Sequence, residues 1–149
     1  MAKMINLDFL CMKTAQSMAV CEGKASDKEN VVTKGLGVLL ENGPYGLMLF
    51  LETNAKKKIA KHYMKELIDI CNDDHIADYI EILAPSDPKD IEDFKKVTEW
   101  LKELAKNLDG YLFVKGLWQQ ALTYARYHAK ALNNDNKDET AGNVTEEAM

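Results

Sequence analysis

The sequence predicts an all-α fold: a compact single-domain bundle of about six helices over residues 1–132, followed by a disordered acidic tail over residues 133–149. Three observations support this prediction. Apolar residues recur at steps of three and four along most of the chain, which is the spacing of one helix face. No segment of any length alternates apolar and polar residues as a half-buried strand does. The chain has 149 residues, of which 46% are hydrophobic and 29% charged, and this balance suits a single globular core.

The first two helices are marked by their apolar stripes and by their ends. The first stripe consists of Leu7, Leu10, Cys11, Thr14, Met18 and Cys21, and Gly23 closes that helix. The segment Ser26-Asp27-Lys28-Glu29 has the pattern of a capping box and predicts the start of the second helix. The second stripe consists of Val31, Val32, Leu36, Leu39 and Leu40. That helix ends at Asn42-Gly43-Pro44, because glycine tolerates a left-handed cap and proline opens the next helix.

The third and fourth helices lie in the middle of the chain. Residues 45–51 are apolar on nearly every side and are expected in the middle of the core. Periodicity alone does not exclude a strand there, but the scarcity of β-branched residues and the helical flanks favour a helix. Thr53-Asn54 is the expected break. The fourth helix then runs to Cys71 with the apolar stripe Ile59, Tyr63, Leu67 and Ile70.

The second half of the chain predicts one short helix and two long ones. The short helix carries Ile76, Tyr79, Ile80 and Leu83, and it ends at Ala84-Pro85 because the residue before a proline avoids the helical region. Asp87-Pro88 starts a long helix, which Asp109-Gly110 stops, with the stripe Ile91, Phe94, Val97, Leu101, Leu104 and Leu108. The last helix has the clearest stripe: Val114, Trp118, Ala121, Leu122, Ala125, Ala129 and Leu132. Its alanines allow a neighbouring helix to approach closely.

The net charge of −5 lies mostly in the predicted tail. Five acidic residues against Lys137 give residues 133–149 a charge of −4, which leaves −1 for residues 1–132. A nearly neutral body can still carry a locally basic face, and the local field governs the attraction of an anionic partner. No apolar run approaches the roughly 20 residues of a membrane helix. The first six residues lack the apolar centre of a signal peptide, so a cytoplasmic protein is expected.

No group of residues predicts catalysis, and no cofactor is expected. The three cysteines, Cys11, Cys21 and Cys71, show no CxxC spacing and are expected to be buried thiols rather than zinc ligands. His62 and His128 each lack a partner at ligand spacing, so they are interpreted as surface or hydrogen-bonded histidines. The sequence therefore predicts a protein that is not an enzyme, with no catalytic residue and no metal ligand.

One segment, Asp73-Asp74-His75, has the residue types of a metal site. Adjacent residues on a helix point about 100° apart, so these three side chains do not converge on one ion without other ligands. Aspartates at the first turn of a helix are favoured as caps and by the helix dipole, and capping is the preferred interpretation. A metal-dependent hydrolase that uses these residues remains the weakest alternative.

The feature that stands out is a cluster of lysines on the predicted fourth helix. At about 100° per residue, one face of that helix carries Lys57, Lys58, Lys61 and Lys65. This face lies opposite Ile59, Tyr63 and Leu67. It is either a solvated helix face or a phosphate-binding surface, and the sequence leaves both interpretations open.

A second basic set lies on the predicted last helix, where Arg126 and Lys130 are four residues apart. Tyr124, Tyr127 and His128 flank them. Cations contact phosphates and exposed aromatic rings stack on bases, although tyrosines at this spacing also occur in helix cores. The residues predicted to bind RNA are therefore Arg126, Lys130, Lys57, Lys58, Lys61 and Lys65.

Several motifs in this order resemble the Cmr small-subunit family of type III-B CRISPR effector complexes. An apolar helix ends in Asn42-Gly43 and leads into a second one that ends Leu49-Phe50-Leu51, and Trp100-Leu101 matches an aromatic–leucine pair. Residues 122–129, Leu-Thr-Tyr-Ala-Arg-Tyr-His-Ala, partly match a final helix of the form Leu-x-Trp-x-Arg-Arg-Phe-Ala. Pro44-Tyr45 departs from the pattern, as do Tyr124, Tyr127 and His128. The resemblance covers most of residues 7–132.

The resemblance implies a non-catalytic, all-helical subunit that stacks with copies of itself beside the guide-bearing backbone subunits. The implied partners are the other Cmr effector subunits, copies of this chain, guide RNA and target RNA, and no membrane. Arg126 is the one basic residue with a counterpart in the family motif. The alternative is a helical protein–protein adaptor that makes no contact with nucleic acid, in which case the lysines are only solvated.

Overall fold

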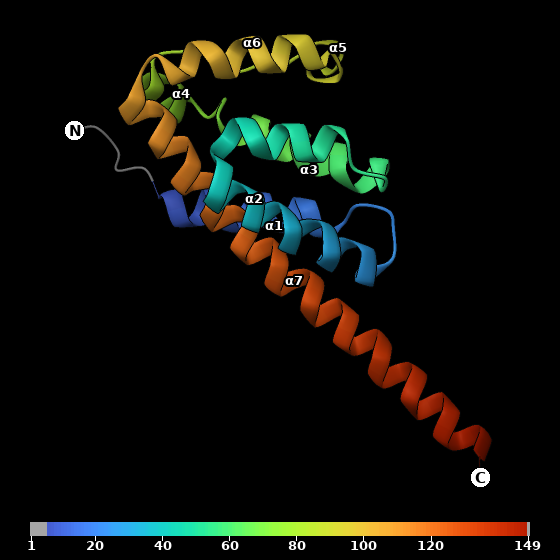
Figure 1. The fold of residues 1–149 in the computed structure, drawn as a ribbon. Coiled ribbons are helices and arrows are strands. Elements are labelled where there is room, and N and C mark those ends of the chain that lie inside the picture. The colour runs from blue at the N-terminus through green and yellow to red at the C-terminus, as the bar shows by residue number, and fades with distance from the viewer. Residues whose placement is uncertain (1–5, 149) are drawn as a thin grey trace.

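The computed structural model describes residues 6–148, with side chains for residues 6–134. This part of the chain contains helices and no strand, which confirms the all-α prediction (Figure 1). The helices are α1 (Leu7–Ala19), α2 (Ala25–Glu52), α3 (Lys57–Ile70), α4 (Asp74–Ile80), α5 (Pro88–Glu92), α6 (Phe94–Ala105) and α7 (Leu108–Ala148). No helix in the described residues combines the length and the apolar character that crossing a membrane requires.

Four helices surround the core. α1 and α2 each pack against both α3 and α7, so that α3 and α7 occupy opposite corners of the bundle. The indole of Trp118 on α7 crosses between them and donates from Nε1 to the carbonyl oxygen of Leu67 on α3, at 2.8 Å. At one end of the bundle, α6 packs against α2 and α7, and α4 packs against α7 (Figure 1).

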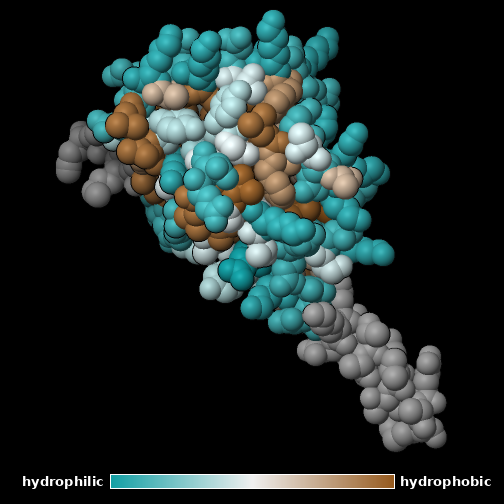
Figure 2. Space-filling model, viewed as in Figure 1, coloured by the Kyte–Doolittle hydropathy of each residue, from teal (hydrophilic) through white to brown (hydrophobic). Residues whose placement is uncertain are grey.

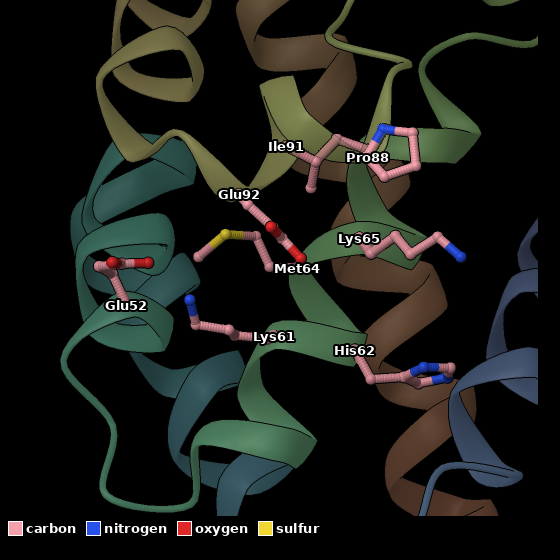
Figure 3. Close-up of a pocket in the computed structure, with 8 residues that line it drawn as sticks. All are labelled: Glu52, Lys61, His62, Met64, Lys65, Pro88, Ile91 and Glu92. Atoms are coloured by element: carbon pink, nitrogen blue, oxygen red, sulfur yellow. The ribbon is translucent and has the colours of Figure 1, made fainter.

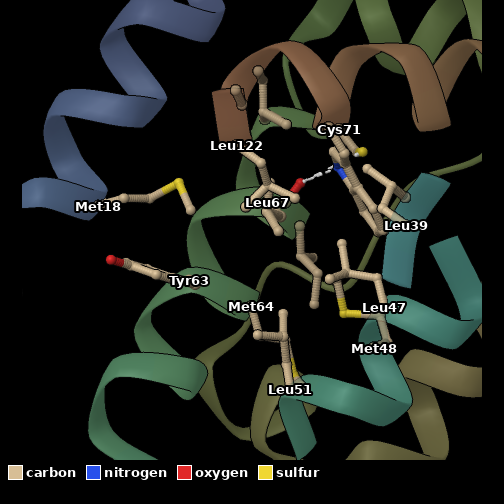
Figure 4. Packing of buried hydrophobic residues seen from close by; sticks show 14 of the residues in the cluster. Met18, Leu39, Leu47, Met48, Leu51, Tyr63, Met64, Leu67, Cys71 and Leu122 are labelled. Atoms are coloured by element: carbon tan, nitrogen blue, oxygen red, sulfur yellow. Dashed lines mark hydrogen bonds between the residues drawn. The ribbon is translucent and has the colours of Figure 1, made fainter. Parts of the chain in front are cut away.

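Most of the core is built from side chains of these four helices, and α4, α5 and α6 add others, among them Ile76, Ile91 and Leu101. Figure 4 shows Met18 from α1, Tyr63 and Leu67 from α3, and Leu122 from α7 meeting residues of α2. The α2 residues at this junction are Leu39, Leu47, Met48 and Leu51, each at most 2% exposed. The stripes predicted for α1, α3 and α7 are therefore largely the buried faces. Five residues that the sequence predicts in the core are exposed instead: Leu40, Tyr79, Leu83, Leu108 and Leu132.

Gly43 divides α2 into two helical parts, as the Asn42-Gly43-Pro44 pattern predicts. Its backbone has φ 77° and ψ −174°, a region open to glycine and strained for other residues. The second part begins at Pro44, and the backbone N–H of Tyr45 donates to the hydroxyl of Tyr111 on α7, at 3.2 Å. The expectation that residues 45–51 are buried on all sides is wrong, because Tyr45 and Leu49 are 43% and 41% exposed.

The predicted capping box at Ser26 does not form. α2 begins one residue earlier, at Ala25, and its N-cap Lys24 makes no side-chain cap hydrogen bond. Lys28 of the predicted box is buried instead, and its Nζ donates to the carbonyl oxygen of Ala19, at 3.1 Å. This bond satisfies a carbonyl at the C-terminus of α1, which ends at Ala19 rather than at Gly23.

The long helix predicted between Pro88 and Leu108 is two helices in the structure. Asp93 lies between α5 and α6 with extended backbone, and its carboxylate accepts from the backbone N–H of Lys95, at 3.2 Å. The chain breaks again after Ala105, and the side chain of Asn107 accepts from the backbone N–H of Gly110, at 3.3 Å. Asp109-Gly110 is therefore part of the first turn of α7 and does not stop the preceding helix.

α7 continues as a helix to Ala148, while its described side chains end at Asn134. The tail predicted for residues 133–149 therefore lies almost wholly outside the described side chains. Asn133 belongs to the bundle, because its Nδ2 donates to Oε2 of Glu29 on α2, at 2.6 Å. The domain boundary placed at residue 132 stays a prediction.

Candidate nucleic-acid interface

The lysine face of α3, consisting of Lys57, Lys58, Lys61 and Lys65, is exposed in the structure. On the opposite side of the helix, Ile59, Tyr63 and Leu67 are at most 4% exposed. The orientation that the sequence predicts for α3 is therefore confirmed.

The lysine face makes no close ion pair among the described side chains. Asp27 lies 3.5 Å from Nζ of Lys56, the residue just before the helix. For the four lysines of the face, no carboxylate among the described side chains lies within 4.0 Å. Lys57 and Lys58 also stand in the first turn of α3, where the helix dipole favours negative charge. An anion bound at this end of α3 would relieve both kinds of repulsion.

Two hollows border the lysine face. At the start of α3, a pocket of about 350 Å³ is lined by Glu22, Gly23, Asp27, Lys56, Lys57, Lys58 and Ile59. Further along, a pocket of about 210 Å³ lies between α2, α3 and α5, and its lining residues are those drawn in Figure 3. There Lys61 points toward Glu52 of α2, and Lys65 points to the other side of α3 (Figure 3). The lysines therefore splay over a broad surface and do not converge on one point.

The edge of α3 that faces α1 is acidic and was not predicted. Glu66 and Asp69 line a hollow of about 320 Å³ between α1 and α3. Burial raises the pKa of both carboxyl groups above their ordinary values, against the opposing attraction of Lys65. Sequence spacing places both residues beside the lysine face, but their burial depends on α1, which the sequence of α3 alone does not place.

His62 occupies the same edge. Its Nε2 lies 2.7 Å from the carbonyl oxygen of Ser17 on α1. Because a carbonyl oxygen only accepts, Nε2 carries the proton in this contact. Oε1 of Glu66 is 4.0 Å from the same nitrogen. The interpretation of His62 as a hydrogen-bonded histidine is confirmed, and the contact joins α1 to α3.

The second basic set lies on α7, where Arg126 is half-buried and Lys130 is exposed. Asn133, seven residues after Arg126 and so on the same side of the helix, bonds Glu29 of α2. Arg126 therefore borders α2. Tyr124, two residues earlier, points to the other flank, and its hydroxyl bonds the carboxylate of Asp8 on α1. Arg126 and Tyr124 therefore lie on different flanks of α7.

The structure does not bring the two basic sets together. The inner side of α3 faces α7, as the hydrogen bond from Trp118 to Leu67 shows. The lysine face is on the outer side of α3, so it points away from the helix that carries Arg126 and Lys130. RNA contact at both sets requires either two surfaces of one molecule or more than one copy of the chain.

The segment Asp73-Asp74-His75 acts as a helix start. The carboxylate of Asp73 accepts from the backbone N–H of His75, at 3.0 Å, and so caps α4. Among the described residues, no three His, Cys, Asp or Glu side chains lie close enough to hold one metal ion. The prediction that the cysteines are buried thiols is confirmed for all three of them.

Exposed apolar side chains are the surface feature that sequence reasoning missed. Near the start of α7, Leu108, Leu112, Tyr79 and Leu83 are between 51% and 77% exposed. The ring of Tyr79 packs against that of Phe113, with centroids 4.7 Å apart. Figure 2 shows hydrophobic side chains at the surface over the start of α7 and near the middle of α2. The helical spacing of Tyr79, Leu83 and Leu108 predicted burial, which is wrong for these three residues.

Neither a protein-family model, nor a curated protein, nor a solved structure matches this chain.

Proposed function

We propose that this chain is a non-catalytic small subunit of a type III-B CRISPR effector complex in the cytoplasm. In this role it stacks with copies of itself and with backbone subunits, and it helps to bind guide and target RNA. The observation that carries the proposal is the exposed lysine face of α3, whose four ammonium groups lack carboxylate partners among the described side chains. The motifs that resemble the Cmr small-subunit family supply the class of complex.

The chemistry of the lysine face suits RNA backbone rather than bases. Lysine presents a compact charge on a flexible stem, and phosphate contacts of this kind carry no sequence information. Lys57 and Lys65 are eight residues apart, about 12 Å along the helix axis, so one subunit covers a short length of strand. Binding by one copy is therefore weak, and it becomes strong when several copies align along one strand and their contributions add.

A second candidate function, a helical protein–protein adaptor without RNA contact, is favoured by a different observation. Several large apolar side chains are exposed, among them Leu83 at 77% and Leu108 at 64%, and exposed apolar side chains of this kind are covered by partner proteins when they lie together. This function predicts that the lysines are dispensable and that these apolar residues are required for association.

Affinity purification of the full chain from its native host separates the two functions. The proposed function predicts that effector subunits and short guide RNAs co-purify with the chain. A double charge reversal, Lys57→Glu with Lys61→Glu, should reduce the recovered RNA, whereas Lys95→Glu with Lys102→Glu on α6 should not. Recovery of partner proteins without RNA, unchanged by either pair of substitutions, would establish the adaptor function instead.

A further inference from the structure

The hollow of about 320 Å³ between α1 and α3 combines carboxylates with an apolar wall. Glu66 and Asp69 line it from α3, and because they are three residues apart they lie on one side of that helix. Leu10 of α1 and Ile70 of α3 supply the apolar part of the lining. Among the described side chains that line this α1–α3 hollow, none belongs to the lysine face.

The two carboxylates of the α1–α3 hollow lack a cationic partner in direct contact. The side chain of Glu66 is 17% exposed, and the nitrogen of His62 that lies 4.0 Å away directs its proton to the carbonyl oxygen of Ser17. Among the described side chains, no lysine or arginine lies within 4.0 Å of Glu66 or Asp69. Burial raises the pKa of both carboxyl groups, against the attraction of Lys65. The hollow therefore holds negative charge that no described side chain neutralises by contact.

Thr14 of α1 adds a buried hydroxyl to the same hollow. Thr14 lines the hollow and is 8% exposed. The hydroxyls of Thr53 and Thr123 each donate to the carbonyl oxygen four residues earlier in the chain, and among the described residues the hydroxyl of Thr14 makes no such bond. A buried hydroxyl without a partner costs free energy, and a ligand that hydrogen-bonds to it removes this cost.

We infer that the α1–α3 hollow binds an alkylammonium group between Glu66 and Asp69. An ammonium group has three N–H donors and no acceptor, so it can pair with both carboxylates and donate to the hydroxyl oxygen of Thr14. The methylene groups attached to it contact Leu10 and Ile70. A bare metal ion suits the site less well, because among the described residues no three His, Cys, Asp or Glu side chains lie close enough to hold one. The inference goes beyond the proposed function, since it requires no RNA and uses none of the basic residues.

Two sources offer the same chemistry. A free diamine such as 1,4-diaminobutane and the lysine side chain of a partner protein both end a four-carbon stem in an ammonium group. The α1–α3 hollow, at about 320 Å³, has room for such a stem, since a water molecule takes up roughly 30 Å³ of the liquid. The experiment therefore uses one probe for each source.

The test is an NMR titration of the full chain with 1,4-diaminobutane and, separately, with N-acetyl-lysine amide, at constant ionic strength. At least one of the two amines should shift the amide resonances of Thr14, Glu66 and Asp69 until they saturate, and should raise the melting temperature. The neutral analogue 1,4-butanediol should do neither. Tighter binding of the diamine assigns the site to a free amine, and tighter binding of the lysine probe assigns it to a lysine of a partner protein.

Two variants remove the groups that hold the ammonium. Glu66→Gln with Asp69→Asn should weaken binding about tenfold or more, because it removes both charges. Thr14→Val should weaken it about threefold or more, because it removes one hydrogen-bond acceptor at nearly constant volume. The double variant replaces poorly solvated carboxylates by neutral amides, so it is expected to fold, and urea denaturation verifies this.

Matched controls separate the site from the effects of net charge and of a lost hydroxyl. Glu99→Gln with Glu103→Gln, on the exposed side of α6, removes the same charge as the double variant, and Thr123→Val on α7 removes an exposed hydroxyl. Both controls should bind the amine as the parent does.

Four results would overturn the inference: neither amine binds saturably, butanediol binds as tightly as the amines, the α6 pair weakens binding as much as the hollow pair, or the hollow pair binds as the parent does. Loss of RNA binding with intact amine binding would contradict the proposed function alone.

Discussion

The indole of Trp118 and the backbone carbonyl of Leu67 connect the two opposite corners of the bundle by a buried hydrogen bond of 2.8 Å. Leu67 lies near the C-terminus of α3, where carbonyls run out of helical partners. The N–H of Cys71 bonds the carbonyl of Ile68 instead, at 3.0 Å. The Leu67 oxygen accepts from Nε1 of Trp118, at 2.8 Å, and from Sγ of Cys71, at 3.6 Å. The stronger of these two donors comes from α7.

Trp118 and Trp100 should respond differently to the same substitution. Their rings pack against each other, with centroids 6.2 Å apart, and both are buried. Among the described side chains, Nε1 of Trp100 is the buried polar atom that lacks a hydrogen-bond partner. Trp118→Phe removes a hydrogen bond and leaves the Leu67 carbonyl with the weak thiol donor of Cys71, so it should cost about 1–3 kcal/mol more than Trp100→Phe. Trp118→Ala should cost about 3–5 kcal/mol.

Urea denaturation of these variants measures the difference in the free energy of unfolding. Equal losses for the two Trp→Phe variants would show that ring packing alone decides the result and that the hydrogen bond to Leu67 contributes nothing. A Trp118→Ala variant as stable as the parent but defective in partner binding would place Trp118 in an interface rather than in the core.

Replacement of Gly43 and of Gly37 by alanine should change the stability of the protein in opposite directions. Gly43 has φ 77° in the break within α2, a conformation that costs other residues about 1–3 kcal/mol. Gly37 is exposed in the helical part of α2, and a Cβ there would meet nothing within 4 Å. Gly43→Ala should therefore destabilise the protein, while Gly37→Ala should stabilise it by up to about 1 kcal/mol. Thermal melts of both variants check this, and a neutral Gly43→Ala would contradict the strain at the break.

The interruption of the helix at Gly43 could be predicted from the sequence, whereas the interruption at Asp93 was missed. The difference has a physical reason. Asn-Gly-Pro changes the backbone itself, and such a signal does not depend on the rest of the fold. At Asp93 the apolar spacing continues from Ile91 through Phe94, so periodicity hides the interruption. The signal for a new helix start was Asp93 itself, since aspartate is a common N-cap. In the structure its carboxylate accepts from the backbone N–H of Lys95.

In the candidate site, too, the features that depend on one helix alone were predictable, and those that depend on its neighbours were not. The lysine face of α3 follows from spacing alone, because a helix with one buried face exposes the other. The separation of Arg126 from Tyr124 and from the lysine face depends on which neighbours flank α7, and this is a property of the tertiary structure. The capping box at Ser26 failed for a similar reason, since Lys28 is drawn into the contact with Ala19 on α1.

Glu66 should destabilise the folded protein at neutral pH. Burial raises the pKa of this carboxyl group above its ordinary value of 4.5. Between the unfolded and the folded pKa, the folded state binds more protons, so stability falls as pH rises through that window. The penalty is absent below the unfolded pKa and complete above the folded one. Glu66→Gln should therefore be more stable than the parent at pH 7 and equally stable in acid.

The measurement is the urea midpoint as a function of pH, with Glu99→Gln on the exposed side of α6 as the control. A parent and a Glu66→Gln variant with parallel pH profiles would contradict the raised pKa. If Glu66→Gln is less stable than the parent at pH 7 and equally stable in acid, favourable contacts of the Glu66 carboxylate outweigh the cost of its burial.

Removal of residues 135–149 should leave the melting temperature nearly unchanged. The segment has no apolar periodicity, and its composition is polar and acidic. Removal of Asn133 as well should lower stability slightly, because it deletes the hydrogen bond to Glu29. Calorimetry on the two truncations under the same conditions makes the comparison. If deletion of residues 135–149 alone lowers the melting temperature by many degrees, these residues pack against the bundle.

RNA contact should be electrostatic and independent of base sequence, and it should be shared between Arg126 with Lys130 and the lysine face of α3. A body with a net charge of −1 over residues 1–132 gives little long-range attraction, so a few phosphate contacts per copy suffice only when several copies align. Affinity of the assembled complex should fall with salt. Arg126→Glu and Lys61→Glu should each weaken it for all RNA sequences alike, since phosphate contacts carry no base information, while Lys102→Glu on α6 should not. Binding measured over a salt series decides the matter: if both reversals bind RNA as the parent does, the basic faces are solvated surface and the adaptor function replaces the proposed one.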